Sequence, residues 1–405
     1  MCSGPYAVAP CTLACPAQVD VPAFVDALAR DDILRAAETI FTENILGGTC
    51  ARVCPVEVLC EGACVLEHEG QKPIQIAALQ RYATDWALVR DIPLRTVTAA
   101  SGHSVAVVGA GPAGLACAGE LAARGHAVTV FEQREEIGGL VRFAIAPYRI
   151  VRAPLPAEQR ALEALGVRFR FGAPVFCSEE LAAYDAVFLG VGLGDDVPLE
   201  LPGDELLGVW ESLSFIEALK GGVLRAVGER VVVIGGGNTA IDVARESVRL
   251  GAGRVTLVYR RTREEMPAYA FEVEEAEDEG VTFAWRTLPV RFVGGDHVQA
   301  VECVSVRQGP ADADGRRRPV PVAGSEFDLR ADTVVKAIGQ RPRPELSGRF
   351  GGLEVDGGRL VVDDDGRTTN RRVFAGGDAV NGGASVVEAV RQGKRAAIAI
   401  DGGLT

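Results

Sequence analysis

The sequence lacks an excess of positive charge, a long hydrophobic run and a recognisable export signal. It carries 42 Lys and Arg against 55 Asp and Glu, a net charge of -13, which argues against nucleic acid or an anionic membrane as a main partner. The least charged stretch, residues 104–119, is too short and too glycine-rich to span a bilayer. The amino end, MCSGPYAVAPC, has neither a basic nor an apolar segment of a signal peptide, so we expect a cytoplasmic protein.

Aromatic residues are also scarce, at 6%, while glycine is abundant, with 48 residues that fall mostly in short motifs. Glycines placed in this way are typical of backbone-mediated ligand binding. The chain has 405 residues, which is too long for one compact core, so we expect two or three domains.

The cysteines are unevenly distributed. Seven of the ten lie in the first 64 residues, at Cys2, Cys11, Cys15, Cys50, Cys54, Cys60 and Cys64. Disulfides are not expected in a reducing compartment, and clustered thiols there more often bind metal or take part in redox chemistry. The isolated Cys117, Cys177 and Cys303 are interpreted as inert buried residues.

The predicted secondary structure changes near residue 100. Before it, segments such as residues 22–30 and 33–41 carry apolar residues at helical spacing. After it, a strand at 104–109, a glycine turn, a helix and a strand at 127–131 follow one another, and the pattern recurs from 230 to 259. This internal repeat predicts two doubly wound α/β domains. The polar segment 309–321 is predicted to be a hairpin loop.

The first glycine turn reads Gly109-Ala-Gly111-Pro112-Ala113-Gly114 between a strand and a helix, and Glu132 ends the next strand. In such a turn the first glycine allows the tight bend, the second lets a diphosphate approach the backbone and the third permits close helix packing. The acid is placed to bind a ribose hydroxyl, so the motif predicts a dinucleotide site.

The second turn contains Gly235, Gly237, Asn238, Thr239 and Ala240 and has the form GxGxxA. The following strand ends in Arg260 and Arg261 and not in an acid, and guanidinium groups suit a 2′-phosphate. We therefore expect NADP here and FAD at the first turn.

A third glycine turn lies near the carboxyl end. Gly377 and Asp378 follow a predicted strand, and Ser385 and Val386 open a predicted helix. The aspartate can bind the ribityl chain of FAD while the helix N-terminus faces the flavin pyrimidine. The FAD domain is then discontinuous and the NADP domain is inserted in it.

At this point the chain resembles the two-dinucleotide-binding flavoproteins over residues 104–405. More narrowly, it is similar to the electron-input family shared by the small subunit of NADPH-dependent glutamate synthase and dihydropyrimidine dehydrogenase. Its matches include Cys11-Thr-Leu-Ala-Cys15, Cys50-Ala-Arg-Val-Cys54-Pro, Cys60-Glu-Gly-Ala-Cys64, Gly138-Gly139-Leu140 and Ala337-Ile-Gly-Gln-Arg-Pro342. The resemblance implies FAD contacts at Gly139 and Leu140. It also implies a helical iron–sulfur domain at 1–100, an FAD domain at 101–226 and 331–405, and an NADP domain at 227–330.

The resemblance further implies [4Fe–4S] clusters in the amino-terminal domain. One would be held by Cys15, Cys54, Cys60 and Gln80, the last at the position where dihydropyrimidine dehydrogenase has a glutamine and glutamate synthase tends to have glutamate. Cys11 and Cys64 match ligands of a second cluster. Its other two family cysteines correspond to Ser3 and Tyr6 here, and Cys2 is out of register. Cys50 recurs in the family without an assigned ligand role.

The family's activity is NADPH oxidation with electron transfer through FAD and [4Fe–4S] to a larger subunit. Because the cofactors carry this chemistry, no protein residue, including the four histidines His68, His103, His126 and His297, is expected to be catalytic. Gln80 favours an FMN-containing dihydropyrimidine dehydrogenase subunit, which reduces uracil or thymine, as the partner. The alternatives are the large subunit of glutamate synthase, or no partner in a stand-alone NADPH diaphorase.

Overall fold

The structure is a computed structural model that describes residues 7–93, 95–151, 153–311 and 317–404. The chain forms two compact units. Unit 1 comprises residues 1–142, 152–193 and 342–405, and unit 2 comprises residues 143–151 and 194–341. The chain therefore enters unit 2 twice, first for the short segment 143–151 and then for the longer segment 194–341.

Unit 1 begins with short helices, consistent with the helical spacing of the sequence. They are α1 (Pro10–Leu13), α2 (Val21–Ala29), α3 (Ile33–Glu43), α4 (Gly47–Val53), η1 (Val56–Val58), α5 (Val65–His68) and α6 (Ile76–Val89). Asp20 and Asp32 cap α2 and α3 by accepting backbone N–H bonds from Ala23 and Arg35. The buried face of α3 includes Ile40 and packs against α6.

The rest of unit 1 is built on a parallel sheet of order β15-β4-β1-β2-β3. Its strands are β1 (Ser104–Val108), β2 (Ala127–Phe131), β3 (Arg168–Arg170), β4 (Ala186–Leu189) and β15 (Val373–Ala375). Its helices are α7 (Pro112–Ala123), α8 (Leu140–Phe143), α9 (Leu155–Ala164), η2 (Ser178–Leu181), α13 (Leu346–Arg349), α14 (Asp378–Asn381) and α15 (Val386–Leu404), with a small ribbon of β13 (Val355–Asp356) and β14 (Arg359–Leu360). The strand order reverses between β1 and β4, which is where doubly wound sheets bind ligands.

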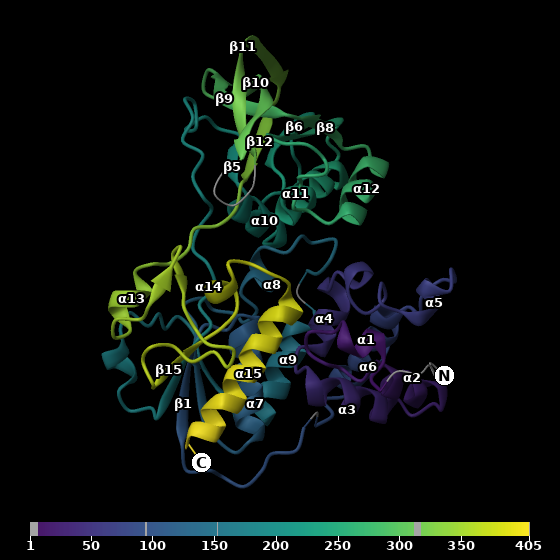
Figure 1. Ribbon diagram of the computed structural model, residues 1–405, viewed down its shortest axis with the longest axis vertical. Helices are drawn as coiled ribbons and strands as arrows, with labels where there is room; N and C mark the ends of the chain where they lie inside the picture. The colour runs from purple at the N-terminus through teal and green to yellow at the C-terminus, as the bar shows by residue number, and fades with distance from the viewer. Residues whose placement is uncertain (1–6, 94, 152, 312–316, 405) are drawn as a thin grey trace. The chain divides into compact units, whose positions relative to one another are not determined.

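The carboxyl-terminal helix α15 lies directly against α7, as Figure 1 shows. The contact depends on Gly393, because a Cβ atom there would lie 2.1 Å from the backbone oxygen of Ala113. The last segment of the chain is thereby fixed beside the helix that follows β1. This packing joins the two parts of the discontinuous domain.

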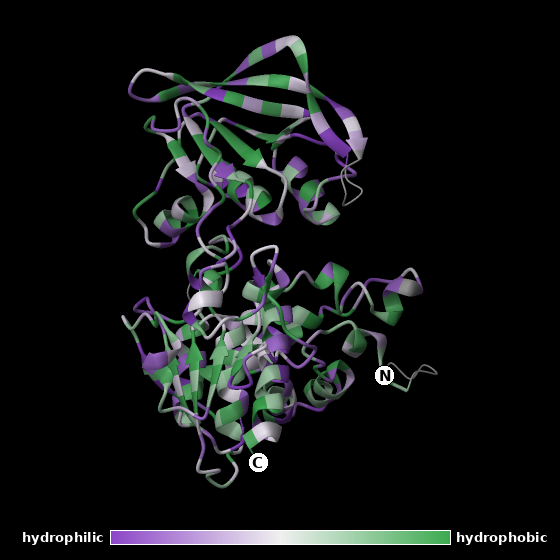
Figure 2. Cartoon of the chain, turned by 60° about the vertical axis from the view of Figure 1, so that its left-hand side comes forward, coloured by the Kyte–Doolittle hydropathy of each residue, from purple (hydrophilic) through white to green (hydrophobic). Residues whose placement is uncertain are grey.

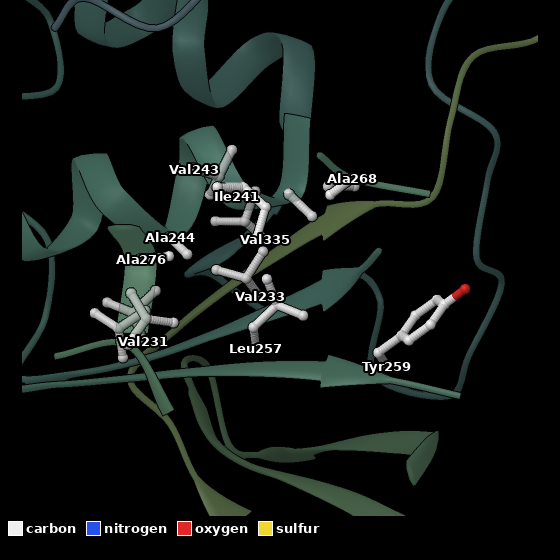
Figure 3. Packing of buried hydrophobic residues seen from close by; sticks show 14 of the residues in the cluster. Val231, Val233, Ile241, Val243, Ala244, Leu257, Tyr259, Ala268, Ala276 and Val335 are labelled. Carbon is white, nitrogen blue, oxygen red and sulfur yellow. The ribbon is translucent and has the colours of Figure 1, made fainter. Parts of the chain in front are cut away.

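Unit 2 contains a second parallel sheet, of order β5-β12-β6-β7-β8. Its strands are β5 (Val209–Glu211), β6 (Arg230–Gly235), β7 (Arg254–Tyr259), β8 (Thr282–Trp285) and β12 (Thr333–Ala337), and its helices are α10 (Ser212–Lys220), α11 (Asn238–Arg249) and α12 (Ala270–Asp278). Apolar residues of α11 such as Ile241 pack on Val233 and Val335 of the sheet (Figure 3). The order reverses between β6 and β12, so the second glycine turn also lies at a switch point.

Unit 2 also carries an antiparallel sheet of β9 (Thr287–Gly294), β10 (Val298–Ala311) and β11 (Arg317–Arg330). Its strands show alternating bands of hydropathy, typical of a sheet with one buried face (Figure 2). The predicted loop at 309–321 was placed too broadly, because residues 309–311 and 317–321 belong to the paired strands.

The predicted fold class is confirmed: two doubly wound domains follow a helical amino-terminal region, and one is inserted in the other. Unit 2 takes in a longer stretch than the predicted 227–330, because β5 pairs with β12 and belongs to the second sheet. The predicted domain limits stay predictions. Within the described ranges, no helix has both the length and the apolar character to cross a membrane.

Candidate cofactor sites

The turn after β1 is shaped by two glycines that no other residue could replace. Gly109 has φ +99°, and a Cβ on it would lie 2.5 Å from the oxygen of Gly190. A Cβ on Gly114 would lie 1.9 Å from the oxygen of Gly109. By contrast, the nearest atom to a Cβ on Gly111 would be 3.9 Å away. The fold requires the outer two glycines and leaves space over Gly111, where a diphosphate would approach.

Residues predicted to contact the first dinucleotide gather at this turn. Gly111 caps α7, which starts at Pro112 and continues with the buried Ala113. Gly139 has φ +51°, and a Cβ on it would lie 3.0 Å from the Cα of Gly111. Leu140 begins α8 next to it. The structure thus brings two predicted motifs together beside a helix N-terminus that has no side-chain cap, which favours anions.

Glu132 has a second role that the sequence did not predict. Its Oε2 accepts from the Ala110 N–H at 2.8 Å and its Oε1 accepts from the Arg134 N–H at 2.9 Å. These bonds hold the turn against the end of β2. An ionised carboxylate has further acceptor sites, so Glu132 still fits a ribose hydroxyl.

The third glycine turn, at Gly377, packs against the helix that follows the first glycine turn. Gly377 has φ +74°, and a Cβ on it would lie 2.9 Å from the Cβ of Ala113. Its N–H donates to Oε1 of Gln392 at 2.7 Å. Burial raises the pKa of Asp378, whose Oδ1 accepts a 3.3 Å bond from the Ala384 N–H. A carboxylate in such surroundings fits a hydroxyl donor such as the ribityl chain.

The start of α15 completes this part of the site. The Ser385 hydroxyl accepts from the Glu388 N–H at 3.3 Å, which caps the helix, and Val386 is its first residue. Ser385 and Val386 therefore lie on the same turn-and-helix segment as Asp378. These contacts fit FAD at the switch point of unit 1.

The second glycine turn repeats this geometry in unit 2. Gly235 has φ +152°, and a Cβ on it would lie 2.1 Å from the oxygen of Ala337. Gly237 caps α11, and a Cβ there would meet no atom within 4 Å. Ala240 is fully buried beneath the turn. The space over Gly237 and a helix N-terminus without a side-chain cap suit a second diphosphate.

Asn238 and Thr239 occupy the first turn of α11 and differ in role. The Asn238 Oδ1 accepts from the Tyr269 N–H at 3.0 Å and ties the loop after β7 to the helix. Thr239 is exposed and available to a ligand. Asn238 therefore positions the segment on which the predicted 2′-phosphate site lies.

The arginines after β7 differ in what they already bind. Arg263 forms an ion pair with Glu277. In the part of the chain that the structure describes, neither Arg260 nor Arg261 has a carboxylate within ion-pairing distance. The Nε of Arg261 is buried and has no hydrogen-bond partner among the same residues. A buried guanidinium nitrogen without a partner fits a phosphate oxygen.

Four thiols come together in the amino-terminal helices: Cys15, Cys50, Cys54 and Cys60. A hydrogen bond to Cys50, burial and the charges of the other thiols raise the pKa of Cys54 well above its usual range. Burial raises the pKa of Cys15, and burial and Cys15 raise the pKa of Cys60 to about 12. Such thiols stay protonated at neutral pH unless a cation stabilises them. This donor set fits an iron–sulfur cluster better than disulfide exchange.

The other predicted ligands lie nearby or outside the described residues. Cys11 on α1 and Cys64 before α5 are buried, and Cys2 lies outside the described ranges. The Gln80 Nε2 donates to the Gly47 oxygen at 2.8 Å, so its amide oxygen is the atom left to reach iron. Within residues 7–93 no three candidate side chains have the spacing for a single metal ion. The ligand assignments stay predictions.

Three positions were missed by the sequence analysis. Gly190 supplies the oxygen against which Gly109 packs, and its only signal was a glycine directly after a buried strand. Gln392 fixes Gly377 from one turn of α15 and gave no signal. Cys50 lies among the predicted ligands, although no ligand role was assigned to it.

Two glycine turns at two switch points, with the segments that complete them, define a pyridine-nucleotide-dependent flavoprotein. The chain belongs to the pyridine nucleotide–disulphide oxidoreductase family, whose model matches residues 103–393. A second model, dihydropyrimidine dehydrogenase domain II with a 4Fe-4S cluster, matches residues 2–92. The protein is an NAD(P)H-dependent oxidoreductase with FAD, NADP(H) and [4Fe–4S] as cofactors.

Several curated relatives align along nearly the whole chain. The glutamate synthase [NADPH] small chain of Halomonas elongata is 36% identical over 98% of this chain and 87% of its own length. The corresponding small chain of Escherichia coli is 36% identical over 98% of this chain and 88% of its own length. The NADP(+)-dependent formate dehydrogenase subunit beta of Moorella thermoacetica is 38% identical over 98% of this chain but only 60% of its own length. The predicted resemblance to the glutamate synthase small-subunit family is confirmed.

Solved structures agree on the fold. FprA of Mycobacterium tuberculosis in complex with NADPH aligns with a TM-score of 0.62, at 22% identity, over 74% of this chain and 84% of its own. Thioredoxin reductase of Lactococcus lactis aligns with a TM-score of 0.59, at 23% identity, over 73% of this chain and 97% of its own. At these identities the likeness concerns the fold alone.

Proposed function

We propose that this chain is the electron-input subunit of an NADPH-dependent glutamate synthase, and that it delivers electrons to a larger catalytic subunit. The observation that carries the proposal is the 36% identity to glutamate synthase small chains, which extends over 98% of this chain and most of each relative. Longer relatives, such as the formate dehydrogenase subunit, contain substantial additional sequence.

Each predicted site would have a distinct task. The cofactors supply the redox chemistry, since flavin exchanges a hydride for single electrons and a cluster carries single electrons. Gly111 and the N-terminus of α7 would bind the FAD diphosphate, while Glu132 and Asp378 would bind its hydroxyl groups. Gly237 and α11 would bind the NADPH diphosphate, and Arg260 and Arg261 its 2′-phosphate.

The thiols would bind the iron–sulfur cluster that passes electrons from FAD to the large subunit. Cys15, Cys54 and Cys60, with Gln80 as the fourth ligand, would bind one [4Fe–4S] cluster. Cys11 and Cys64 would belong to a second cluster if one forms. No protein side chain is required to move a proton in hydride transfer, which agrees with His126 being bonded to Ser101 and Asp401.

Two other candidates have specific support. Gln80 and the match to dihydropyrimidine dehydrogenase domain II favour an FMN-containing pyrimidine-reducing partner. The missing family cysteines at Ser3 and Tyr6 favour a stand-alone diaphorase. The full-length agreement with glutamate synthase small chains supports the glutamate synthase partner more strongly than Gln80 supports the pyrimidine enzyme.

The test is reconstitution with candidate large subunits from the same genome. We expect glutamate to form from glutamine and 2-oxoglutarate, with NADPH consumed, only when this chain and the glutamate synthase large subunit are both present. Reduction of uracil with a dihydropyrimidine dehydrogenase subunit would favour the second candidate. Dye reduction alone, with no product from either large subunit, would favour the diaphorase.

A further inference from the structure

Arg286 is the single residue between β8 and β9, and its backbone conformation is unusual. Its φ is +51°, and it is the one non-glycine residue with a positive φ in the part of unit 2 that the structure describes. This left-handed conformation favours glycine or asparagine, and strained residues of this kind cluster at ligand sites. The backbone conformation therefore gives no reason for an arginine here, and we consider what its side chain can do.

Main-chain hydrogen bonds hold Arg286 beside Arg261. The Arg286 N–H donates to the Arg261 oxygen at 3.0 Å, and the Val306 N–H donates to the Arg286 oxygen at 2.7 Å. The strands that precede the two arginines run parallel, with Tyr259 opposite Trp285. Both arginines therefore follow the carboxyl ends of neighbouring strands, which is the edge where doubly wound sheets bind their ligands.

The guanidinium group of Arg286 is available to a ligand. Its residue is exposed, and among the residues that the structure describes no carboxylate lies within ion-pairing distance of it. Two other arginines of unit 2 are already paired, Arg263 with Glu277 and Arg291 with Glu302. On a chain with a net charge of -13, an exposed cation without such a partner favours an anionic ligand.

The loop after Arg261 has a fixed shape, and the charge of Arg286 acts on it. The Glu265 Oε2 accepts from the Thr262 N–H and hydroxyl, both at 3.1 Å, and from the Gln308 amide at 3.2 Å. The pKa of Glu264 is lowered by a hydrogen bond from its own backbone and by one from Thr262, and the charges of nearby arginines, including Arg286, add to this effect. The positive charge of Arg286 is thus felt in the loop that adjoins the predicted phosphate site.

We propose that Arg286 is a further cation of the 2′-phosphate site and determines the preference for NADPH over NADH together with Arg260 and Arg261. A phosphate monoester has three strong acceptor oxygens, so it can bind donors from more than one strand. Arg260 and Arg261 would approach it from β7, and Arg286 from β8. This inference rests on the proposed function, specifically on 2′-phosphate binding by the two arginines after β7.

The experiment compares the binding of 2′,5′-ADP, which carries the 2′-phosphate, with that of 5′-AMP, which lacks it. Calorimetry on the full chain measures both, and dye reduction gives kcat/KM for NADPH and NADH. Arg286→Asn removes the charge, while asparagine tolerates the positive φ and the main-chain bonds to Arg261 and Val306 remain. We expect this variant to keep its FAD and its Tm.

Its affinity for 2′,5′-ADP should fall roughly tenfold, because one charge-assisted hydrogen bond is lost. The KM for NADPH should rise to a similar extent, while 5′-AMP binding and the NADH reaction stay unchanged. Arg286→Lys keeps the charge and should bind 2′,5′-ADP more tightly than Arg286→Asn does. Arg254→Asn is the matched control, at the exposed first residue of β7, and should change nothing.

Three outcomes would overturn the inference. Unchanged 2′,5′-ADP binding in Arg286→Asn means that Arg286 does not act on the phosphate. An equal loss for 5′-AMP means that Arg286 only shapes the loop. A lysine variant no better than the asparagine variant means that the charge contributes nothing. Arg261→Ser, measured in parallel, tests the proposed site itself: if its 2′,5′-ADP binding is also unchanged, the 2′-phosphate site lies elsewhere.

Discussion

Gly111 and Gly237 stand at matching positions before α7 and α11, and the fold itself requires neither. A Cβ on Gly111 would be 3.9 Å from its nearest neighbour, and a Cβ on Gly237 would meet nothing within 4 Å. Both have negative φ values, so larger residues can adopt their backbone conformation. Each position therefore allows a ligand to be blocked without strain in the turn.

We predict that Gly111→Val yields folded protein without FAD, and that Gly237→Val keeps FAD but loses affinity for NADPH. The valine side chain would occupy the space into which each diphosphate must enter. Flavin absorbance and NADPH-dependent dye reduction measure the two effects. Each variant is the control for the other, and normal FAD content in Gly111→Val would contradict the placement of the first site.

The arginines after β7 allow a second test at the level of single residues, which concerns the preference for NADPH over NADH. Changing Arg260 and Arg261 to Ser should remove charge-assisted bonds of about 1.5–3 kcal/mol each, a loss of at least an order of magnitude in kcat/KM for NADPH. Activity with NADH should change little. Arg263→Ser is the matched control, since Arg263 is already paired with Glu277. The assignment fails if the unmodified enzyme prefers NADH.

At the scale of elements, one buried contact joins α4 to α9. Glu158 is fully buried, and it accepts from the Thr49 N–H at 2.9 Å and from the Thr49 hydroxyl at 2.6 Å. Burial raises the pKa of Glu158 from 4.5 to about 7. Between these values the folded protein holds a proton that the unfolded chain has released, so the unfolding free energy falls as pH rises through this range.

We predict that Glu158→Gln removes this dependence, because an amide keeps both contacts with Thr49 and does not ionise. Relative to the unmodified protein, its stability should rise between pH 5 and 8 by up to about 3 kcal/mol. Thermal unfolding across this range measures the effect. Glu163→Gln, at an exposed position of the same helix, should show no such trend. A constant difference in Tm at all pH values would mean that Glu158 does not titrate there.

The sequence predicted the elements better than the contacts among them. The spacing of the glycines was sufficient to place both turns after strands, because only glycine allows those close approaches. It could not predict that Glu132 holds the turn or that Gln392 fixes Gly377. These contacts arise from packing between segments far apart in the chain, or from side-chain positions that spacing alone leaves open.

For the whole molecule, the proposed function separates hydride uptake from electron delivery. We predict that Cys54→Ser retains FAD and NADPH-dependent reduction of a dye or quinone, because the nucleotide sites are untouched. It should lose iron, the broad visible absorption of the cluster and glutamate formation with the large subunit. Gln80→Ala should have a milder effect, since three thiolates remain. Parallel loss of dye reduction and FAD in Cys54→Ser would point to a structural cluster.

The central claim is that electrons leave this flavoprotein through an iron–sulfur cluster. The most direct measurement is the iron, acid-labile sulfide and FAD content of unmodified protein purified without oxygen. We predict iron and sulfide equivalent to at least one [4Fe–4S] cluster for each FAD. Full FAD content with no iron would contradict the relay and leave a stand-alone NADPH reductase.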